Sequence, residues 1–158
     1  MKISERPEYK TKSKPMTFSE TAIVSDVVRM MTENRYGSVV VVNEDHTISG
    51  IVTERDLMTK LLYNNMDPKK TKLSDIMTKD VRTANEDDNV IDWLRIMSNE
   101  RFRHLPVVNE SGQIINMMSQ GDFVSYTWPD LLDGLKYKAK ESWGFGHQVI
   151  ILVIVLLL

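Results

Sequence analysis

The feature that most constrains the fold of this chain is an internal repeat. When the sequence is shifted by 66 positions, residues 17–57 align with residues 83–123 without a gap, and thirteen of these 41 pairs are identical. Two unrelated segments of this composition would share roughly two or three identities. The chain therefore contains two copies of one unit. A unit of about 60 residues buries little surface alone, so we expect the two copies to pack together.

Each copy carries the same pattern of elements. Apolar residues at helical spacing predict amphipathic helices over 24–31 and 90–97, and β-branched runs predict strands over 39–42, 48–52, 105–108 and 114–118. A second helix is expected after Thr53 or Ser119, and a short extended piece over 16–18 or 82–84. The predicted fold is therefore α+β, with two β-α-β-β-α repeats packed as a pseudo-two-fold pair and a C-terminal hydrophobic helix or tail.

The composition along the chain predicts the domain organisation. Residues 1–14 are polar and basic without an apolar period, so we expect a mobile or loosely docked arm. We expect repeat 1 at 15–63, a polar linker at 64–72, repeat 2 at 73–127, an amphipathic juxtamembrane segment at 128–146 and an apolar tail at 147–158.

Composition also bears on several classes of function. The chain has no Cys, three scattered His and a formal net charge of −2. It therefore lacks thiol chemistry and a recognisable metal motif, and nucleic-acid binding would draw only on the basic arm. No nucleophile with a neighbouring base is recognisable, so we expect a protein without catalytic activity, without catalytic or metal-binding residues and without a required cofactor.

One short motif occurs at the same place in both copies. Thr53-x-x-Asp56 and Ser119-x-x-Asp122 each place a hydroxyl at a helix start and a carboxylate one turn later. The helix start favours phosphate, and a carboxylate can accept hydrogen bonds from a ribose diol. The alternative is a capping box, which only satisfies the helix's own donors. Two occurrences in a duplicated unit favour a ligand site, because pseudo-symmetry would turn both motifs toward one cleft.

The segments GIVTERDL (Gly50–Leu57), NMMSQGDF (Asn116–Phe123) and RFRHLPVV (Arg101–Val108) resemble a tandem pair of cystathionine-β-synthase (CBS) domains, a Bateman module. The resemblance covers about residues 16–127. The turn LSDIM before the second copy is also typical, whereas the first copy has PEYKT at 7–11 and lacks it. The resemblance implies a regulatory homodimer whose central cleft binds AMP, ADP, ATP or a related adenosyl ligand.

The resemblance also implies two unequal ligand sites. In the stronger one Asp56 would work with Arg103 and His104, and a planar Arg fork suits phosphate. Occupancy of one site and occupancy of both are each compatible with the sequence. In the other site, by the same resemblance, Asp122 would face residues without charge, and a neighbouring arginine could supply the missing cation; these residues are Gly37, Ser38 and Arg55.

Further residues follow from the resemblance. The extended segments expected to line the adenine pockets contain Thr83 and Ala84 in one copy, and Thr17 and Phe18 in the other. Asn116 stands where the family usually has Gly, and we expect it to crowd the ligand base.

The last ten residues, Val149–Leu158, form an unbroken apolar run. Lysines and then aromatic residues precede it, in the order expected at the cytoplasmic entrance of a membrane segment; these are Lys136, Lys138, Lys140, Trp143 and Phe145. Ten helical residues reach about 15 Å, half the hydrocarbon layer. We expect a truncated membrane anchor; shallow insertion and a buried strand in an oligomer are the alternatives.

Together these observations predict an adenine-nucleotide sensor in the cytoplasm, held at the inner face of the cell membrane. The alternative is a structural dimerisation module for a membrane partner, in which both motifs only cap helices.

Overall fold

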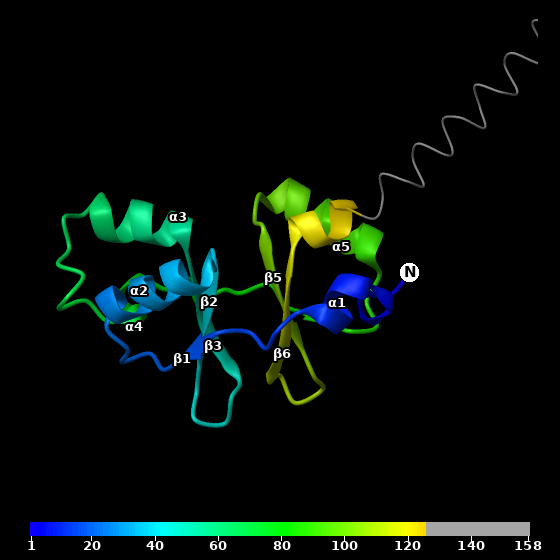
Figure 1. Cartoon of the computed structure of the whole chain (residues 1–158), viewed down its shortest axis with the longest axis horizontal. Coiled ribbons are helices and arrows are strands. Elements are labelled where there is room, and N and C mark those ends of the chain that lie inside the picture. The colour runs from blue at the N-terminus through cyan, green and yellow to red at the C-terminus, as the bar shows by residue number, and fades with distance from the viewer. Residues whose placement is uncertain (126–158) are drawn as a thin grey trace, which may run out of the picture. The chain divides into compact units, whose positions relative to one another are not determined.

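A computed structural model describes residues 1–125 of the chain (Figure 1). Contacts divide the chain into two compact units, Met1–Gln120 and Gly121–Leu158. The first unit contains both repeats up to the end of their last strand. In the second unit, residues 121–125 are helical.

The first repeat contains a three-stranded sheet with the order β1-β2-β3. Its elements are β1 (Thr17–Phe18), α2 (Val24–Asn34), β2 (Ser38–Val42), β3 (Ile48–Thr53), α3 (Glu54–Asp56) and a π-helical turn, η2 (Leu57–Leu62). Strand β1 runs parallel to β2, and β2 is antiparallel to β3. The predicted β-α-β-β-α unit is therefore confirmed in this repeat.

The second repeat builds the same sheet 66 residues later. It contains β4 (Ala84–Asn85), α5 (Val90–Glu100), β5 (His104–Val108) and β6 (Ile114–Ser119), with the order β4-β5-β6. The strand registers match as well, since Ser38 pairs with Thr53 and His104 pairs with Ser119. The duplication therefore extends from the sequence to the backbone.

The core of the first repeat forms where α2 covers the sheet. Val24, Val27 and Met31 lie at helical spacing and are almost completely buried, together with Val39 and Val41 of β2. Because side chains alternate along a strand, Val40 points to the opposite face, and it is also fully buried. Strand β2 is thus covered on both faces.

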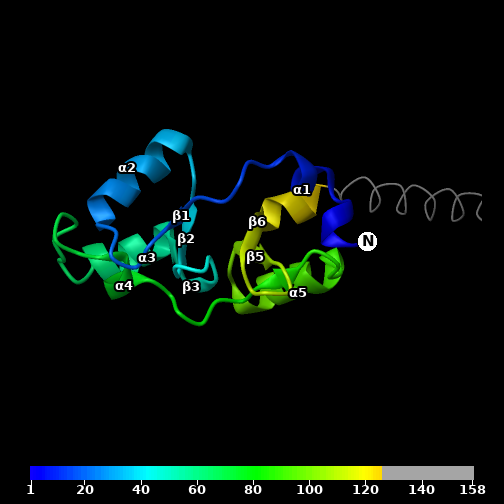
Figure 2. The same cartoon turned by 90° about the horizontal axis from the view of Figure 1, so that it is seen from below.

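The two hairpin turns of the first unit are joined. Thr47 and Gln113 form an isolated antiparallel bridge, and the Gln113 amide donates to the Asp45 carbonyl at 2.7 Å. The backbone N–H of Ile114 donates to the carbonyl of His46. Figures 1 and 2 show the two sheets beside each other within this unit.

The N-terminal segment corrects the expectation of a mobile or loosely docked arm. It forms a 3₁₀ turn, η1 (Ile3–Glu5), and a short helix, α1 (Pro7–Thr11), next to β6 (Figure 2). The backbone of Ile3 donates to Asp88, and the Tyr9 hydroxyl donates to Glu86 at 2.9 Å. Ile3 and Arg6 are fully buried. The lack of an apolar period misled because a few buried residues and backbone bonds, rather than an amphipathic face, dock this segment.

Helices α1 and α4 (Leu73–Ile76) occupy equivalent positions, 66 residues apart. Leu73, Ile76 and Met77 belong to the core of the first repeat, although the sequence places them at the start of the second. Helix α1 in turn lies on the second repeat. The absence of a helical turn from the first copy, expected from PEYKT, is therefore wrong, and each turn packs on the other repeat's sheet.

The close approach of β3 to the end of α4 explains why residue 50 is a glycine. A Cβ atom at Gly50 would lie 2.6 Å from Sδ of Met77 and 3.1 Å from the carbonyl oxygen of Thr78. In the second repeat the same position holds Asn116, whose amide donates to the carbonyl of Tyr9 in α1 at 2.8 Å. Strand β3 thus approaches α4 closely because residue 50 has no side chain, whereas the equivalent strand β6 contacts α1 through the side chain of Asn116.

The expected C-terminal hydrophobic helix and the segments 128–146 and 147–158 lie outside the described residues. Within residues 1–125, no helix is both long and apolar enough to cross a bilayer.

Candidate functional site

One cavity of the described residues has a volume of about 720 Å³ and is bounded by both repeats. The end of β3, helix α3 and the segment after α4 form one side, and the end of α5 with the start of β5 forms the other (Figure 1). The lining residues that carry charge are Glu54, Arg55, Asp56, Asp80, Arg82, Glu100, Arg101 and Arg103. The cavity therefore presents a dense mixture of arginines and carboxylates.

The Thr53-x-x-Asp56 motif begins α3 and lies on this cavity. The backbone N–H and the hydroxyl of Thr53 donate to Oδ2 of Asp56 at 2.9 and 2.8 Å. The backbone N–H of Asp56 donates in return to Oγ1 of Thr53 at 3.3 Å. This reciprocal pattern is a capping box, so the motif satisfies the helix start at the same time as it lines the cavity.

The second oxygen of Asp56 is also engaged. Nζ of Lys60 lies 2.8 Å from Oδ1, and the hydroxyl of Thr78 donates to the same oxygen at 3.0 Å. Burial alone would raise the pKa of Asp56, but the hydrogen bonds from Lys60, Thr53 and Thr78 outweigh it and hold the pKa below its ordinary value. Asp56 is therefore a buried anion with well-defined partners.

Arg103 and His104 lie on the same cavity as Asp56, as the sequence predicted. His104 begins β5 of the second repeat and Arg103 directly precedes it, whereas Asp56 follows β3 of the first. The His104 ring faces the first repeat, because a Cβ at Gly37 would lie 3.2 Å from its Cε1 atom. The structure thus brings together the three residues of the predicted stronger site.

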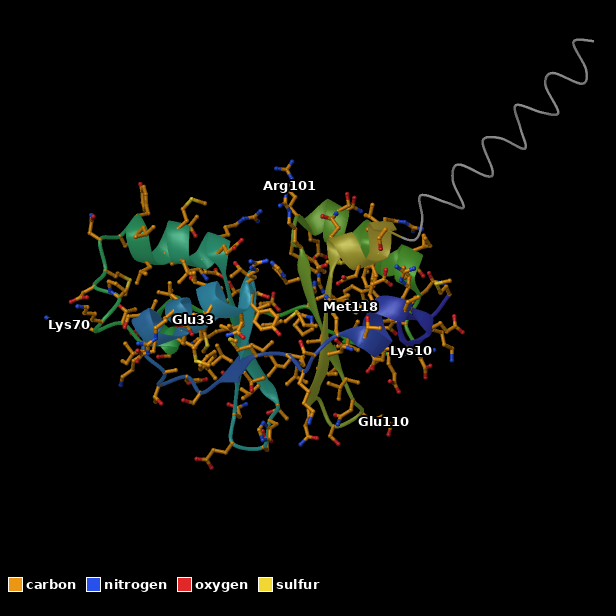
Figure 3. The ribbon with its side chains drawn as sticks, in the orientation of Figure 1. Lys10, Glu33, Lys70, Arg101, Glu110 and Met118 are labelled. Atoms are coloured by element: carbon orange, nitrogen blue, oxygen red, sulfur yellow. The ribbon has the colours of Figure 1, made fainter. Side chains whose placement is uncertain are left out.

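Arg55, which was expected to serve the other site, is not among the described lining residues of the smaller cavity. Arg55 lines the larger cavity, and its Nη1 atom donates to the carbonyl oxygen of Arg101 at 3.0 Å. Figure 3 shows Arg101 at the end of α5 nearest to α3. Because α3 directly follows β3, its side chains lie at the cavity that the end of β3 borders. Arg55 therefore connects the two repeats across the rim of the larger cavity.

An ion pair between Arg82 and Glu100 also lies on the larger cavity. Nε and Nη2 of Arg82 each lie 2.9 Å from an oxygen of Glu100, a bidentate arrangement. The pair is largely exposed. It joins the segment before β4 to the end of α5, and both belong to the second repeat.

A smaller cavity of about 170 Å³ lies at the pseudo-equivalent position. Gly37, Ser38 and Ser119 line it, as predicted. Its cationic lining residues were not predicted; they are Lys12, Lys14 and Arg35. Gly37 and Ser38 carry no charge, and the three cations beside them supply charge to this cavity. These cations come from the end of the N-terminal segment and of α2, outside the short motifs.

Some predicted residues do not line either cavity among the described residues. Thr17 and Phe18 form β1, and Phe18 packs on the core of the first repeat. Thr83 precedes β4, and Ala84 is fully buried. The chain borders the cavities slightly earlier, at 12–16 and 80–82. Strand pairing holds Thr17, Phe18 and Ala84 in the two sheets, and the role of these residues and of Thr83 in lining adenine pockets stays a prediction.

Two further predicted residues behave differently. Asp122 lies in the second unit and is partly buried; its place in a site stays a prediction. Asn116 is 7% exposed, donates to the carbonyl of Tyr9 and is not among the described lining residues of either cavity; its effect on a ligand base stays a prediction.

Sequence reasoning missed several cavity residues. Those of the larger cavity include Thr78, Asp80, Arg82, Glu100 and Phe102, and those of the smaller include Lys12, Lys14, Arg35 and Tyr36. The repeat contained a signal for two of these positions. Arg35 matches Arg101 and Tyr36 matches Phe102, and each matched pair occupies the same wall of its own cavity.

A scan against protein families matches the CBS domain at residues 8–63 and 73–128. A mitochondrial CBS domain-containing protein of Arabidopsis thaliana, CBSX3, is 37% identical over 105 residues, which cover 64% of this chain and 50% of that protein. An uncharacterized protein of Methanopyrus kandleri is 34% identical over 109 residues, with 69% of this chain and 56% of that protein covered. The chain thus matches about half the length of these curated relatives.

Solved structures show the same architecture. A putative signal-transduction protein with CBS domains from Burkholderia ambifaria has a TM-score of 0.71 and 30% identity, covering 81% of this chain and 91% of that one. The CBS domain protein PAE2072 from Pyrobaculum aerophilum, solved in complex with AMP, has a TM-score of 0.68 and 25% identity, with 77% and 89% covered. The CBS pair of MJ0100, at 21% identity and a TM-score of 0.69, shows the fold alone; it was solved with 5′-methylthioadenosine and S-adenosylmethionine.

Proposed function

Because the chain belongs to the CBS-domain family, we propose that it is a regulatory module that binds AMP, or a related adenosyl ligand, in its larger cavity. The observation that carries the proposal is the meeting of Thr53 and Asp56 from one repeat with Arg103 and His104 from the other on one cavity. An AMP complex of a similar protein supports the choice of ligand.

The size and charge of the larger cavity support this assignment. Its volume of about 720 Å³ falls within the usual range of ligand pockets, roughly 300–1,000 Å³, whereas the smaller cavity of about 170 Å³ falls below it. Arg103 supplies a planar guanidinium for a phosphate group. The carboxylate of Asp56 supplies acceptors for ribose hydroxyls.

Isothermal titration calorimetry of the full chain with AMP, ADP, ATP and S-adenosylmethionine tests the proposal. We expect binding of AMP, and we expect Arg103→Ala to weaken it about tenfold or more, because a hydrogen bond to a charged group contributes about 1.5–3 kcal/mol. Arg29→Ala is the matched control, since Arg29 pairs with Asp26 on α2 and does not line the cavity. Folded wild-type protein that binds none of the four ligands would contradict the proposal.

A regulatory role requires that the ligand bind two states of the protein differently. We propose that the responding assembly is a homodimer. Met58 and Leu62 of η2 and Tyr63 directly after it support this proposal, since 61%, 67% and 82% of their surface is exposed. Sedimentation of the full chain is expected to show a dimer that Leu62→Glu dissociates, whereas Lys70→Glu does not.

A structural module without ligand binding is the second candidate. The capping box of Thr53 and Asp56 favours it, because such a box stabilises a helix without any ligand. This candidate predicts that Asp56→Ala costs about 1 kcal/mol of stability and leaves every calorimetric trace without binding heat. Binding of AMP that Asp56→Ala weakens would exclude it.

We also propose that the apolar run Val149–Leu158 attaches the module to the cytoplasmic face of the cell membrane. The order of lysines, aromatic residues and apolar residues before and within the run supports this proposal. In a flotation assay with phosphatidylcholine vesicles, we expect the full chain to float. The double variant Val153→Asp and Leu156→Asp is expected to stay at the bottom, and equal behaviour of the two proteins would contradict the attachment.

A further inference from the structure

Asp56 has no spare acceptor for a ligand. An ionised carboxylate offers about four acceptor positions. Thr53 uses two of them on Oδ2 through its N–H and its hydroxyl, and Lys60 and Thr78 use the two on Oδ1. A ribose hydroxyl that binds Asp56 must therefore displace one of these donors.

Of the donors to Oδ1 of Asp56, Thr78 is the one that lines the cavity where a ligand would bind. Thr78 lines the larger cavity, whereas Lys60 is not among its described lining residues and approaches Asp56 from η2. Thr53 is held in place by the helix start that it caps. The hydroxyl of Thr78 therefore occupies the cavity side of Oδ1.

Thr78 can release Asp56 at little cost. Its hydroxyl also accepts a hydrogen bond from Nζ of Lys60 at 2.9 Å, so it keeps a partner when it leaves Asp56. Its backbone is fixed to β3, because its N–H donates to the carbonyl of Ile51 and its carbonyl accepts from the N–H of Ile51. Release therefore requires only a rotation of the O–H bond, which leaves Oγ1 within reach of Lys60.

We infer that Thr78 is an internal competitor for Asp56, which lowers the affinity of the larger cavity for ligands with a ribose diol. This inference rests on the proposed function and adds to it a residue that sets affinity and ribose selectivity. It also names the first contact that a bound ribose changes, at the segment that leads from α4 through Asp80 and Arg82 to β4.

Calorimetry with adenosine and with 2′,3′-dideoxyadenosine tests the inference on the full chain. Thr78→Val keeps the shape and the backbone bonds but removes the hydroxyl. We expect it to bind adenosine about fivefold more tightly than wild type, the usual scale of one neutral hydrogen bond, and to bind dideoxyadenosine with unchanged affinity. Thr78→Ser keeps the hydroxyl and should bind like wild type.

Thr59→Val is the matched control. It makes the same chemical change on η2, where the Thr59 hydroxyl donates to the carbonyl of Arg55 and does not line the cavity. It should leave both affinities unchanged. The inference is overturned if Thr78→Val binds adenosine no more tightly than wild type, or if both nucleosides gain equally, which would indicate altered packing.

The outcomes separate this inference from the proposed function. Adenosine binding by wild type with equal affinity in Thr78→Val overturns the inference alone. Absence of adenosine binding by wild type, Thr78→Val and Thr78→Ser overturns the inference, and the proposed function falls with it only if wild type also binds no AMP. Binding by Thr78→Val when wild type gives no heat supports both, because it shows the competition directly.

Discussion

The two cavities of the first unit share a backbone and differ in their side chains. Each lies at the end of a β-hairpin, and the strand registers around them agree at an offset of 66 residues. Yet one cavity has about 720 Å³ and the other about 170 Å³. Where the larger has Arg82, Glu100, Arg103 and Thr78, the smaller has, in the same order, Met16, Asn34, Gly37 and Lys12.

The two repeats therefore share one backbone fold, whereas the side chains around their cavities differ. The larger cavity carries both arginines and carboxylates, and Asp56 is one of these carboxylates. The smaller is lined by the cations Lys12, Lys14 and Arg35, and none of its described lining residues is acidic. The two sites of the pair are therefore unequal.

The largest expected effect comes from exchanging the residues that differ on β3 and β6. Gly50→Asn places a side chain against Met77 and the Thr78 carbonyl, and we expect a loss of about 3 kcal/mol of stability from overpacking. Asn116→Gly removes one hydrogen bond to Tyr9 and should cost about 1 kcal/mol. Urea denaturation measures both, and equal losses would contradict the distinct packing of the two repeats.

The next effect concerns Asp56 and acid. Because its folded pKa lies below its ordinary value of 3.8, its contribution is fully present above that value and is lost as the pH falls through the folded pKa. We expect Asp56→Asn to lose about 2 kcal/mol at pH 7, since bonds to a charged acceptor are replaced by weaker ones. The difference between the two proteins should shrink below pH 3.8; a constant difference down to pH 2 or so would contradict the assignment.

A smaller effect concerns the ion pair of Arg82 and Glu100 on the larger cavity. Arg82→Met makes this position resemble Met16 and leaves Glu100 without the bidentate partner. Because the pair is largely exposed, we expect less than about 1 kcal/mol of lost stability. Thermal denaturation measures it, and a loss of several kcal/mol would show that the pair supports the fold of the second repeat.

The smallest effect concerns the N-terminal segment. Burial and the hydrogen bond to Glu86 raise the pKa of Tyr9 to about 12 from 10.0. Its contribution to stability is thus present below pH 10.0 and is lost as the pH rises toward about 12. In an absorbance titration of the five tyrosines, one should titrate later than the rest and should disappear in Tyr9→Phe. Five tyrosines with one common pKa would contradict the docking.

Much of the fold could be predicted from the sequence because the pattern of each element occurs in both copies of the repeat. The helices at α2 and α5 and the strands β2, β3, β5 and β6 follow from apolar periods that recur at equal positions. Helix α1 could not be predicted in this way. Its PEYKT sequence shares no residue with LSDIM, and it is held by bonds to a distant part of the chain.

Residues of the candidate site could be predicted only where a polar or charged side chain lies in or beside a recognisable sequence motif. Thr53, Asp56, Arg103 and His104 stand in or beside recognisable segments, and the structure brings them to one cavity. Thr78 and Lys60 carried no such signal, because their role depends on where α4 and η2 pack around Asp56. Tertiary contacts of that kind cannot be read from local spacing.

The most direct test of the account is the stoichiometry of AMP binding to the full chain. The account predicts one AMP per chain, since only the larger cavity falls in the size range of ligand pockets. Calorimetry of wild type and of Arg103→Gly, which gives the larger cavity the residue of the smaller, measures it. One site that Arg103→Gly weakens is the expected result; two equal sites per chain, or one that Arg103→Gly leaves unchanged, would contradict the account.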